Sequence, residues 1–61
     1  MRVRHAKRLH NHDQVRLKKT GEVGLVVGTP ALRQVDGKWY VMLHVQFPES
    51  GYTECTHLEV E

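Results

Sequence analysis

The sequence predicts a small all-β domain, with five short strands closed into a strongly bent barrel behind a basic N-terminal arm. Beyond His12, apolar and polar residues alternate in short runs, and no helical apolar spacing is sustained over three turns. Gly, Pro and Asp separate these runs at the short intervals typical of β proteins. Because 61 residues are too few for a two-sheet sandwich of ordinary size, the strands are expected to close into one small barrel.

The length also limits function and location. A chain of 61 residues forms one domain with a thin core, which excludes most enzyme classes. Cys55 is the only cysteine and cannot close an intramolecular disulfide, so a reducing compartment fits best. The longest apolar run, Trp39–Leu43, is far shorter than a membrane span, and the N-terminus lacks the apolar segment of a signal peptide. We expect a cytoplasmic protein.

The first two strands are expected on either side of a turn at Thr20–Gly21. Residues Asp13–Lys18 alternate, so that Val15 and Leu17 face the core of a half-buried strand. Residues Glu22–Val27 form the second strand, whose glycine leaves its register open. Either Val23, Leu25 and Val27 or Gly24 and Val26 face the core, and we favour the second pair.

The third strand, Lys38–Phe47, has the clearest pattern in the chain. Gly28–Pro30 and Asp36–Gly37 bracket a loop before it, and Asp-Gly is a strong turn signal. At about 3.3 Å per residue the strand is long enough to bend and serve two sheet faces in sequence, as strands of small barrels do. Trp39 is expected in the core, with a position at the rim as the alternative. The inner face is Trp39, Val41, Leu43, Val45 and Phe47, and the outer face is Tyr40, Met42, His44 and Gln46.

Two short strands are expected to complete the sheet. Pro48–Gly51 forms a turn, Tyr52–Cys55 a fourth strand, and Thr56–His57 a tight link. Leu58–Glu61 forms the last strand, with both of its apolar residues, Leu58 and Val60, turned inward.

The segment Asp13–Val26 resembles the start of KOW and Tudor-like barrels, which read Asp-x-Val-x-apolar and then Gly-x-x-Gly-x-Val. Gly21 stands where the turn needs a positive φ, and Gly24 stands where the bent backbone passes close to its neighbour. The long third strand and the end of the chain extend the likeness over residues 13–61. The resemblance implies an SH3-like barrel whose relatives bind RNA, other nucleic acid or peptides, or serve as accessory subunits of larger complexes.

Plasmid-borne, trimethoprim-insensitive dihydrofolate reductases also resemble this chain in size and strand order. Their pore-lining strand reads Val-Gln-Ile-Tyr, whereas the corresponding residues here are Tyr52–Cys55 and differ from it. Cys55 and His57 form a cysteine–histidine pair, but no third group is placed to orient the histidine. We therefore predict that the protein is not an enzyme.

Charge is divided between the two ends of the chain. Residues 1–19 hold seven Lys or Arg against one acid, and residues 20–61 hold two against six acids. Residues 1–12 are expected to form a flexible basic arm that binds a polyanion by counterion release. Two alternatives remain open, a purely solubilising arm or one that lies against the acidic end of the chain. Those acids are Glu54, Glu59 and Glu61.

Metal binding is not expected. Two histidine or cysteine pairs with i, i+2 spacing would complete a tetrahedral zinc site only if they met in space. Histidines at exposed ends are more often simply solvated, so we expect neither a metal nor another cofactor. The four candidate ligands are His10, His12, Cys55 and His57.

The outer face of the third strand suggests two kinds of binding. We expect it beside Arg16 and Lys18 of another strand, and an aromatic and basic surface is typical of a nucleic-acid groove. Tyr and Met are also enriched at protein interfaces, so a heterologous partner or a homo-oligomer remains the alternative. The interface candidates are Tyr40, Met42, His44 and Gln46.

The resulting hypothesis is a small non-catalytic module that binds RNA or DNA without sequence specificity, or a protein of a nucleic-acid-handling complex. Cationic side chains would contact phosphates, and an aromatic ring would stack on bases. The predicted nucleic-acid-binding residues are Arg2, Arg4, Lys7, Arg8, Arg16, Lys18, Lys19 and Tyr40, with Trp39 as a second stacking candidate.

Overall fold

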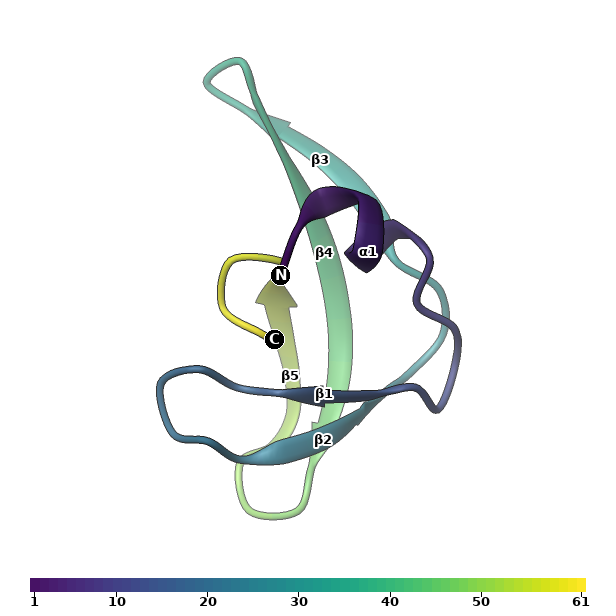
Figure 1. The fold of residues 1–61 in the computed structure, drawn as a ribbon, viewed down its shortest axis with the longest axis vertical. Helices are drawn as coiled ribbons and strands as arrows, with labels where there is room; N and C mark the ends of the chain where they lie inside the picture. Colours follow the sequence, from purple (N-terminus) through teal and green to yellow (C-terminus); the bar gives the residue numbers. More distant parts are fainter.

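Five antiparallel strands and one short helix make up the protein in a computed structural model that describes residues 1–61 (Figure 1). The prediction of an all-β chain is therefore confirmed. No helix has the length and apolarity needed to cross a bilayer. The elements are α1 (Val3–Lys7), β1 (Gln14–Arg16), β2 (Val23–Val26), β3 (Ala31–Val35), β4 (Lys38–Phe47) and β5 (Gly51–Thr56).

Strand β4 is the centre of the sheet, and its bounds agree with the prediction. It pairs with β3 through its first half, with β2 through Val45 and Gln46, and with β5 from Met42 to Phe47. In β4, Met42 pairs with both β3 and β5, and Val45 and Gln46 pair with both β2 and β5. Strands β2 and β3 therefore lie along one edge of β4, and β5 lies along the other. The long strand thus pairs with β3 and then with β2 along one edge, within a single sheet.

The core lies on one face of β4. Val41, Leu43, Val45 and Phe47 are fully buried, which confirms four of the five residues predicted for the inner face. The favoured register of β2 is also confirmed, because its Gly24 and Val26 are buried. The whole core consists of Ala6, Leu9, Val15, Val26, Val41, Leu43, Val45, Phe47, Cys55 and Val60.

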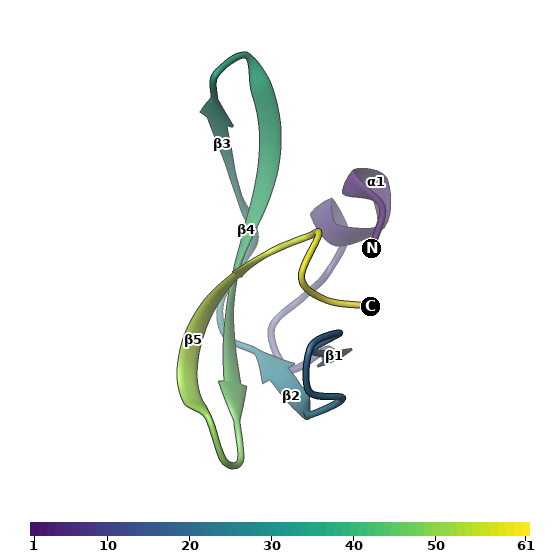
Figure 2. The same ribbon diagram turned by 90° about the vertical axis from the view of Figure 1, so that its left-hand side faces the viewer.

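Trp39 was predicted in the core and is instead 55% exposed. The cause is β3, a strand that the sequence analysis assigned to a loop. Asp36 and Gly37 have φ of 51° and 78°, which suits a two-residue hairpin turn between β3 and β4. Figures 1 and 2 show that this hairpin extends beyond the rest of the sheet, so no element covers Trp39.

The end of the chain returns to β1. Arg16 N donates to Glu61 O at 2.9 Å, Glu61 N donates back to Arg16 O at 2.8 Å, and Leu17 forms an isolated bridge with Val60. The predicted last strand is therefore reduced to one bridge. Val60 is buried as expected, but Leu58 is 57% exposed because it lies in the turn that follows β5.

Residues 1–12 pack against the sheet, although a separate flexible arm was expected. Ala6 and Leu9 belong to the core, and Val3 packs against it. His12 N donates to Val26 O at 2.7 Å, and the Met1 amine donates to His57 O at 2.9 Å. The inward residues follow an i, i+3, i+6 spacing, which is a short helical pattern at the start of the sequence.

Candidate nucleic-acid interface

Helix α1 and the residues next to it carry a group of exposed cations. Because Val3, Ala6 and Leu9 turn toward the core, the charged residues between them turn to solvent. Arg4, Lys7 and Arg8 line a surface hollow together with Val3. We call Arg2, Arg4, Lys7 and Arg8 the helix cations; all four are exposed.

The helix cations have no acidic partners. Eight of the nine Lys and Arg side chains have no carboxylate oxygen within 4.0 Å, and the exception is Arg16. The remaining ion pairs join histidines to carboxylates, at 3.8 Å for His10–Asp13 and 3.7 Å for His44–Glu54. The positive charge of α1 is therefore left for solvent or for a ligand.

Lys18 lies close to the beginning of the chain, and Lys19 follows it. Burial, followed by the nearby Lys18 ammonium, lowers the pKa of the Met1 amine below 8.0. Lys18 N also donates to Glu59 O at 2.9 Å, which fixes this part of the chain beside the C-terminal turn. Both lysines are exposed, and they line a surface hollow with Leu17, Thr53 and Glu59.

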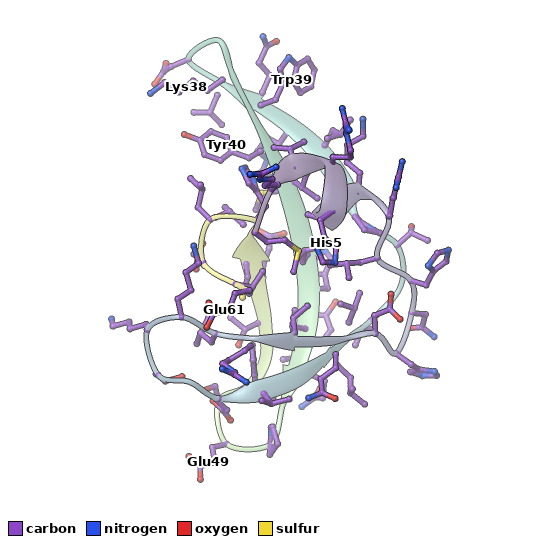
Figure 3. The ribbon with its side chains drawn as sticks, viewed as in Figure 1. His5, Lys38, Trp39, Tyr40, Glu49 and Glu61 are labelled. Carbon is purple, nitrogen blue, oxygen red and sulfur yellow. The ribbon has the colours of Figure 1, made fainter.

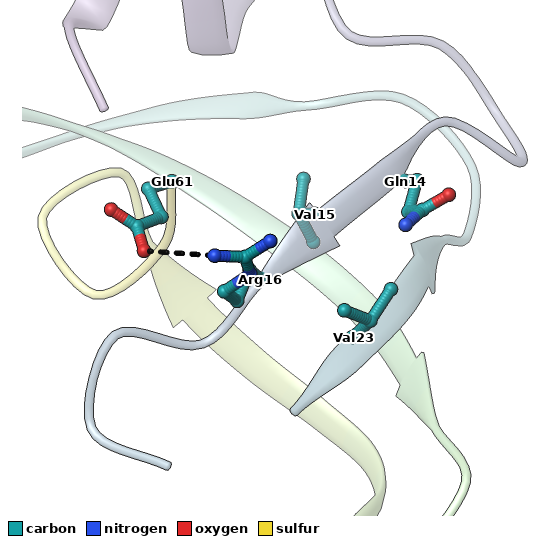
Figure 4. Close-up of a pocket in the computed structure, with 5 residues that line it drawn as sticks. All are labelled: Gln14, Val15, Arg16, Val23 and Glu61. Atoms are coloured by element: carbon teal, nitrogen blue, oxygen red, sulfur yellow. Dashed lines mark ion pairs between the residues drawn. The ribbon is translucent and has the colours of Figure 1, made fainter. Parts of the chain in front are cut away.

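Arg16 is in a different electrostatic position. Its Nη1 lies 3.9 Å from Glu61 Oε1, and both side chains are more than half exposed. It lines a surface hollow with Gln14, Val15, Val23 and Glu61 (Figure 4). Of the predicted phosphate contacts, Arg16 is the one whose charge the protein itself balances.

The expected contact between the outer face of β4 and Arg16 or Lys18 does not form. Strand β2 lies between β1 and β4, so the two sets of side chains are separated. The neighbours of His44 are instead Glu54 and Tyr52 of β5, with the His44 and Tyr52 rings stacked at a centroid distance of 5.5 Å. The sequence could not show which strand would lie beside β4.

The two aromatic candidates lie on opposite faces of the β3–β4 hairpin. Figure 3 shows Lys38 and Tyr40 projecting to one side and Trp39 to the other. Tyr40 is half-buried, and its ring lies 6.0 Å from that of His57. Trp39 shares the face of β4 on which α1 packs, and it is the more exposed ring. Trp39 is therefore the better stacking candidate.

Cys55 and His57 have structural positions. His57 is only 7% exposed, and its Nδ1 accepts the Val41 N–H at 3.2 Å. Burial, then the Met1 amine and Lys18, lower the pKa of His57 below its ordinary value of 6.5. Burial and the neighbouring Glu59 and Glu54 raise the pKa of the Cys55 thiol.

The four metal-ligand candidates, His10, His12, Cys55 and His57, are not brought together. No group of three or more His, Cys, Asp or Glu side chains is arranged to hold a metal ion. The His12 backbone N–H donates to Val26 O of β2, whereas His57 hydrogen-bonds to Val41 of β4.

Comparisons with known proteins add nothing to this geometry. No protein-family model matches the chain, and no curated protein or solved structure is significantly similar to it.

Proposed function

We propose that this protein is a non-catalytic module that binds nucleic acid through the helix cations. The observation that carries the proposal is that these four side chains are exposed, have no carboxylate within 4.0 Å, and extend from a segment anchored by Ala6 and Leu9. Because the segment is held by the core, little chain entropy is lost when it meets a polyanion. Phosphate contacts of this kind carry no base specificity.

Trp39 supplies the stacking surface in this proposal. A base stacked on an aromatic side chain contributes about 1–3 kcal/mol, and every base has a π face. The indole is exposed and lies on the same face of β4 as α1, whereas Tyr40 is half-buried on the other face. A flexible single strand with unstacked bases is therefore the preferred form of ligand.

We also propose that the domain is an SH3-like barrel of the KOW or Tudor-like type. The support is that β1 pairs with β2 on one side, while on the other Arg16 hydrogen-bonds to Glu61 and Lys18, just after β1, hydrogen-bonds to Glu59. The sheet thus curls back toward its first strand. Gly24 is buried against β4, at the position where the resemblance requires close backbone approach. Small barrels of this type commonly act as binding modules.

The test is the anisotropy of labelled single-stranded and duplex RNA and DNA during titration with the full chain at several salt concentrations. Removing residues 1–12 would delete core residues, so paired substitutions are the better probe. Arg4→Gln with Arg8→Gln should weaken binding and lower the slope of log K against log salt by about 1.5, since each phosphate contact contributes about 0.7–0.9.

The matched control is Arg33→Gln with Lys38→Gln, which removes the same charge from the β3–β4 hairpin. Trp39→Ala should weaken binding to single strands by about tenfold or more while leaving the salt slope unchanged. Equal losses from the two charge pairs would mean that net charge, not the helix cations, drives binding. No binding at low salt would exclude the proposal.

A second candidate function is protein interaction or self-association through the outer face of β4. The observation that favours it is the row formed by Leu25, Gln46 and Tyr52, in which the first and last are 46% and 60% exposed. Exposed apolar side chains beside His44, whose ring stacks on Tyr52, suit an interface. In sedimentation equilibrium, Tyr52→Glu should dissociate an oligomer that forms through this face, and the wild type should stay monomeric if the face has another use.

A further inference from the structure

Strand β3 presents an open backbone edge. It pairs with β4 on one side, and all five of its residues are exposed. In an antiparallel strand, the N–H and C=O of one residue point to the same edge, and alternate residues point to opposite edges. Val41 exchanges hydrogen bonds with His57, so its backbone groups point away from β3. The backbone N–H and C=O groups of Tyr40 and Met42 therefore point toward β3.

The register then shows which groups of β3 are free. Ala31 and Arg33 lie opposite Met42 and Tyr40 and form the hydrogen-bonded pairs. Leu32 and Gln34, the alternate residues, direct their N–H and C=O groups outward. Pro30 precedes the strand, and no proline or inward-facing charge interrupts Ala31–Val35, so these backbone groups are free to pair. Arg33 is the single charged residue of the strand.

The side chains around this edge differ between the two faces of the hairpin. On the inner face, Leu32 and Trp39 are 51% and 55% exposed. On the outer face, Arg33 and Lys38 are exposed and have no carboxylate within 4.0 Å. An added strand would therefore match this edge if it placed apolar residues on the inner face and an acidic residue on the outer face.

The protein already contains one pairing of this kind. On β1 and the residue after it, the exposed Arg16 alternates with Val15 and Leu17, which face inward. The strand-like segment that pairs with it places Val60 in the core and Glu61 beside Arg16 at 3.9 Å. A basic and apolar strand thus receives an acidic and apolar one within the same chain.

A second copy of the chain is disfavoured in the register that pairs the whole β3 edge. Two β3 strands that pair antiparallel must keep their inner faces on the same side, and the central register then puts Arg33 opposite the same residue of the other copy. Like charges directly opposite each other destabilise strand pairing.

We propose that the β3 edge binds an extended acidic segment of a partner protein as an additional antiparallel strand. Its acidic residue lies opposite Arg33, and its flanking apolar residues lie opposite Leu32 and Gln34. The backbone hydrogen bonds provide affinity and the alternating side chains provide selectivity, as in other cases of strand addition. This site is independent of the helix cations, so its test does not depend on nucleic-acid binding.

The probe is the capped pentapeptide Thr-Val-Glu-Val-Thr, which reads the same in both directions. Titrated into the full ¹⁵N-labelled chain up to about 5 mM, it should shift the Leu32 and Gln34 amides most, with a dissociation constant on the order of 1 mM. Methylating the backbone nitrogen of one valine removes a group that faces β3 and should weaken binding about tenfold. Methylating the central glutamate nitrogen, which faces solvent, should change binding little.

The charge requirement is tested by reversal. Arg33→Glu should weaken binding of the glutamate peptide about fivefold, and the variant should prefer the matching peptide with a central lysine. Because Arg33 is exposed, its replacement should leave the fold intact. Unchanged amide signals away from β3 would confirm this. The proposal is overturned by an absence of shifts, by shifts centred on His44 and Tyr52, by equal effects of the two methylations, or by dilution-dependent shifts of β3 without peptide.

Discussion

Gly24 is the position where one added methyl group should do the most damage. A Cβ there would lie 2.6 Å from Phe47 Cδ1, 2.7 Å from Gln46 O and 2.8 Å from Val45 Cγ1. The Phe47 ring can rotate only within a filled core, and Gln46 O belongs to the backbone of β4. The φ of Gly24 is not positive, so alanine meets no backbone strain and the whole penalty is steric.

The magnitude follows from these contacts. Overpacking a filled core costs about 1–3 kcal/mol, and a clash with backbone belongs near the upper limit. The lower entropy of the unfolded chain returns about 0.5–1 kcal/mol, so Gly24→Ala should lose about 2 kcal/mol. A domain of this size has about 3–9 kcal/mol in total, and Tm should fall by about 8–16 °C.

Thermal and urea unfolding followed by circular dichroism measure this change directly. Gly21→Asn is the control, because its φ of 78° suits asparagine and no atom lies within 4 Å of an added Cβ. It should change Tm by only a few degrees, about 4 °C at most. If Gly24→Ala unfolds within about 2 °C of the wild type, β2 does not cross β4 as closely as described.

Three further predictions concern single side chains. The pKa of His57 is lowered in the folded protein, so as pH falls the unfolded chain binds the proton first and stability should fall below pH 6.5. In His57→Gln, the difference between the urea midpoints at about pH 7.5 and 5.5 should therefore be smaller than in the wild type. Glu22 accepts hydrogen bonds from Ser50 Oγ and from the Glu49 and Ser50 N–H groups, and these bonds lower its pKa. Its contribution to folding stability is therefore present above pH 4.5 and is lost as pH falls below that value. This loss of stability at low pH should be missing in Glu22→Gln. Cys55 is buried with a raised pKa, so a thiol reagent should label it only at the rate of opening, and reaction as fast as in urea would contradict its burial.

Strand β4 could be read from the sequence because its two faces differ. Four consecutive inward positions are apolar and buried, which fixes the register of a ten-residue strand. Gly24 was placed correctly for a related reason, since a buried strand that crosses another closely has room for glycine and not for a side chain.

Strand β3 could not be read in this way. All five of its residues are exposed, so burial imposes no alternation on Ala31–Val35, and pairing with β4 alone holds them. No element covers Trp39 either, which explains its exposure. Its place in the apolar row of β4 did not show where the core ends. Lateral strand order is equally invisible in the sequence, and the predicted contact of Arg16 with the outer face of β4 was wrong because β2 intervenes.

The charge division along the sequence left open whether the basic end would be neutralised by the acidic end, and the fold bears on this question. Glu61 lies beside Arg16, Glu54 lies beside His44, and Glu59 accepts hydrogen bonds from Thr56. Each C-terminal acid is therefore committed to a neighbour on the sheet, and none lies within 4.0 Å of the helix cations.

This arrangement separates two effects of salt. Exposed pairs such as Arg16 with Glu61 contribute at most about 1 kcal/mol, so the stability of the domain should change little with ionic strength. Binding by uncompensated cations should instead weaken steeply, because each phosphate contact releases a counterion. A urea midpoint that stays constant from low to physiological salt, while nucleic-acid affinity falls over the same range, would show that α1 acts on the ligand and not on the fold.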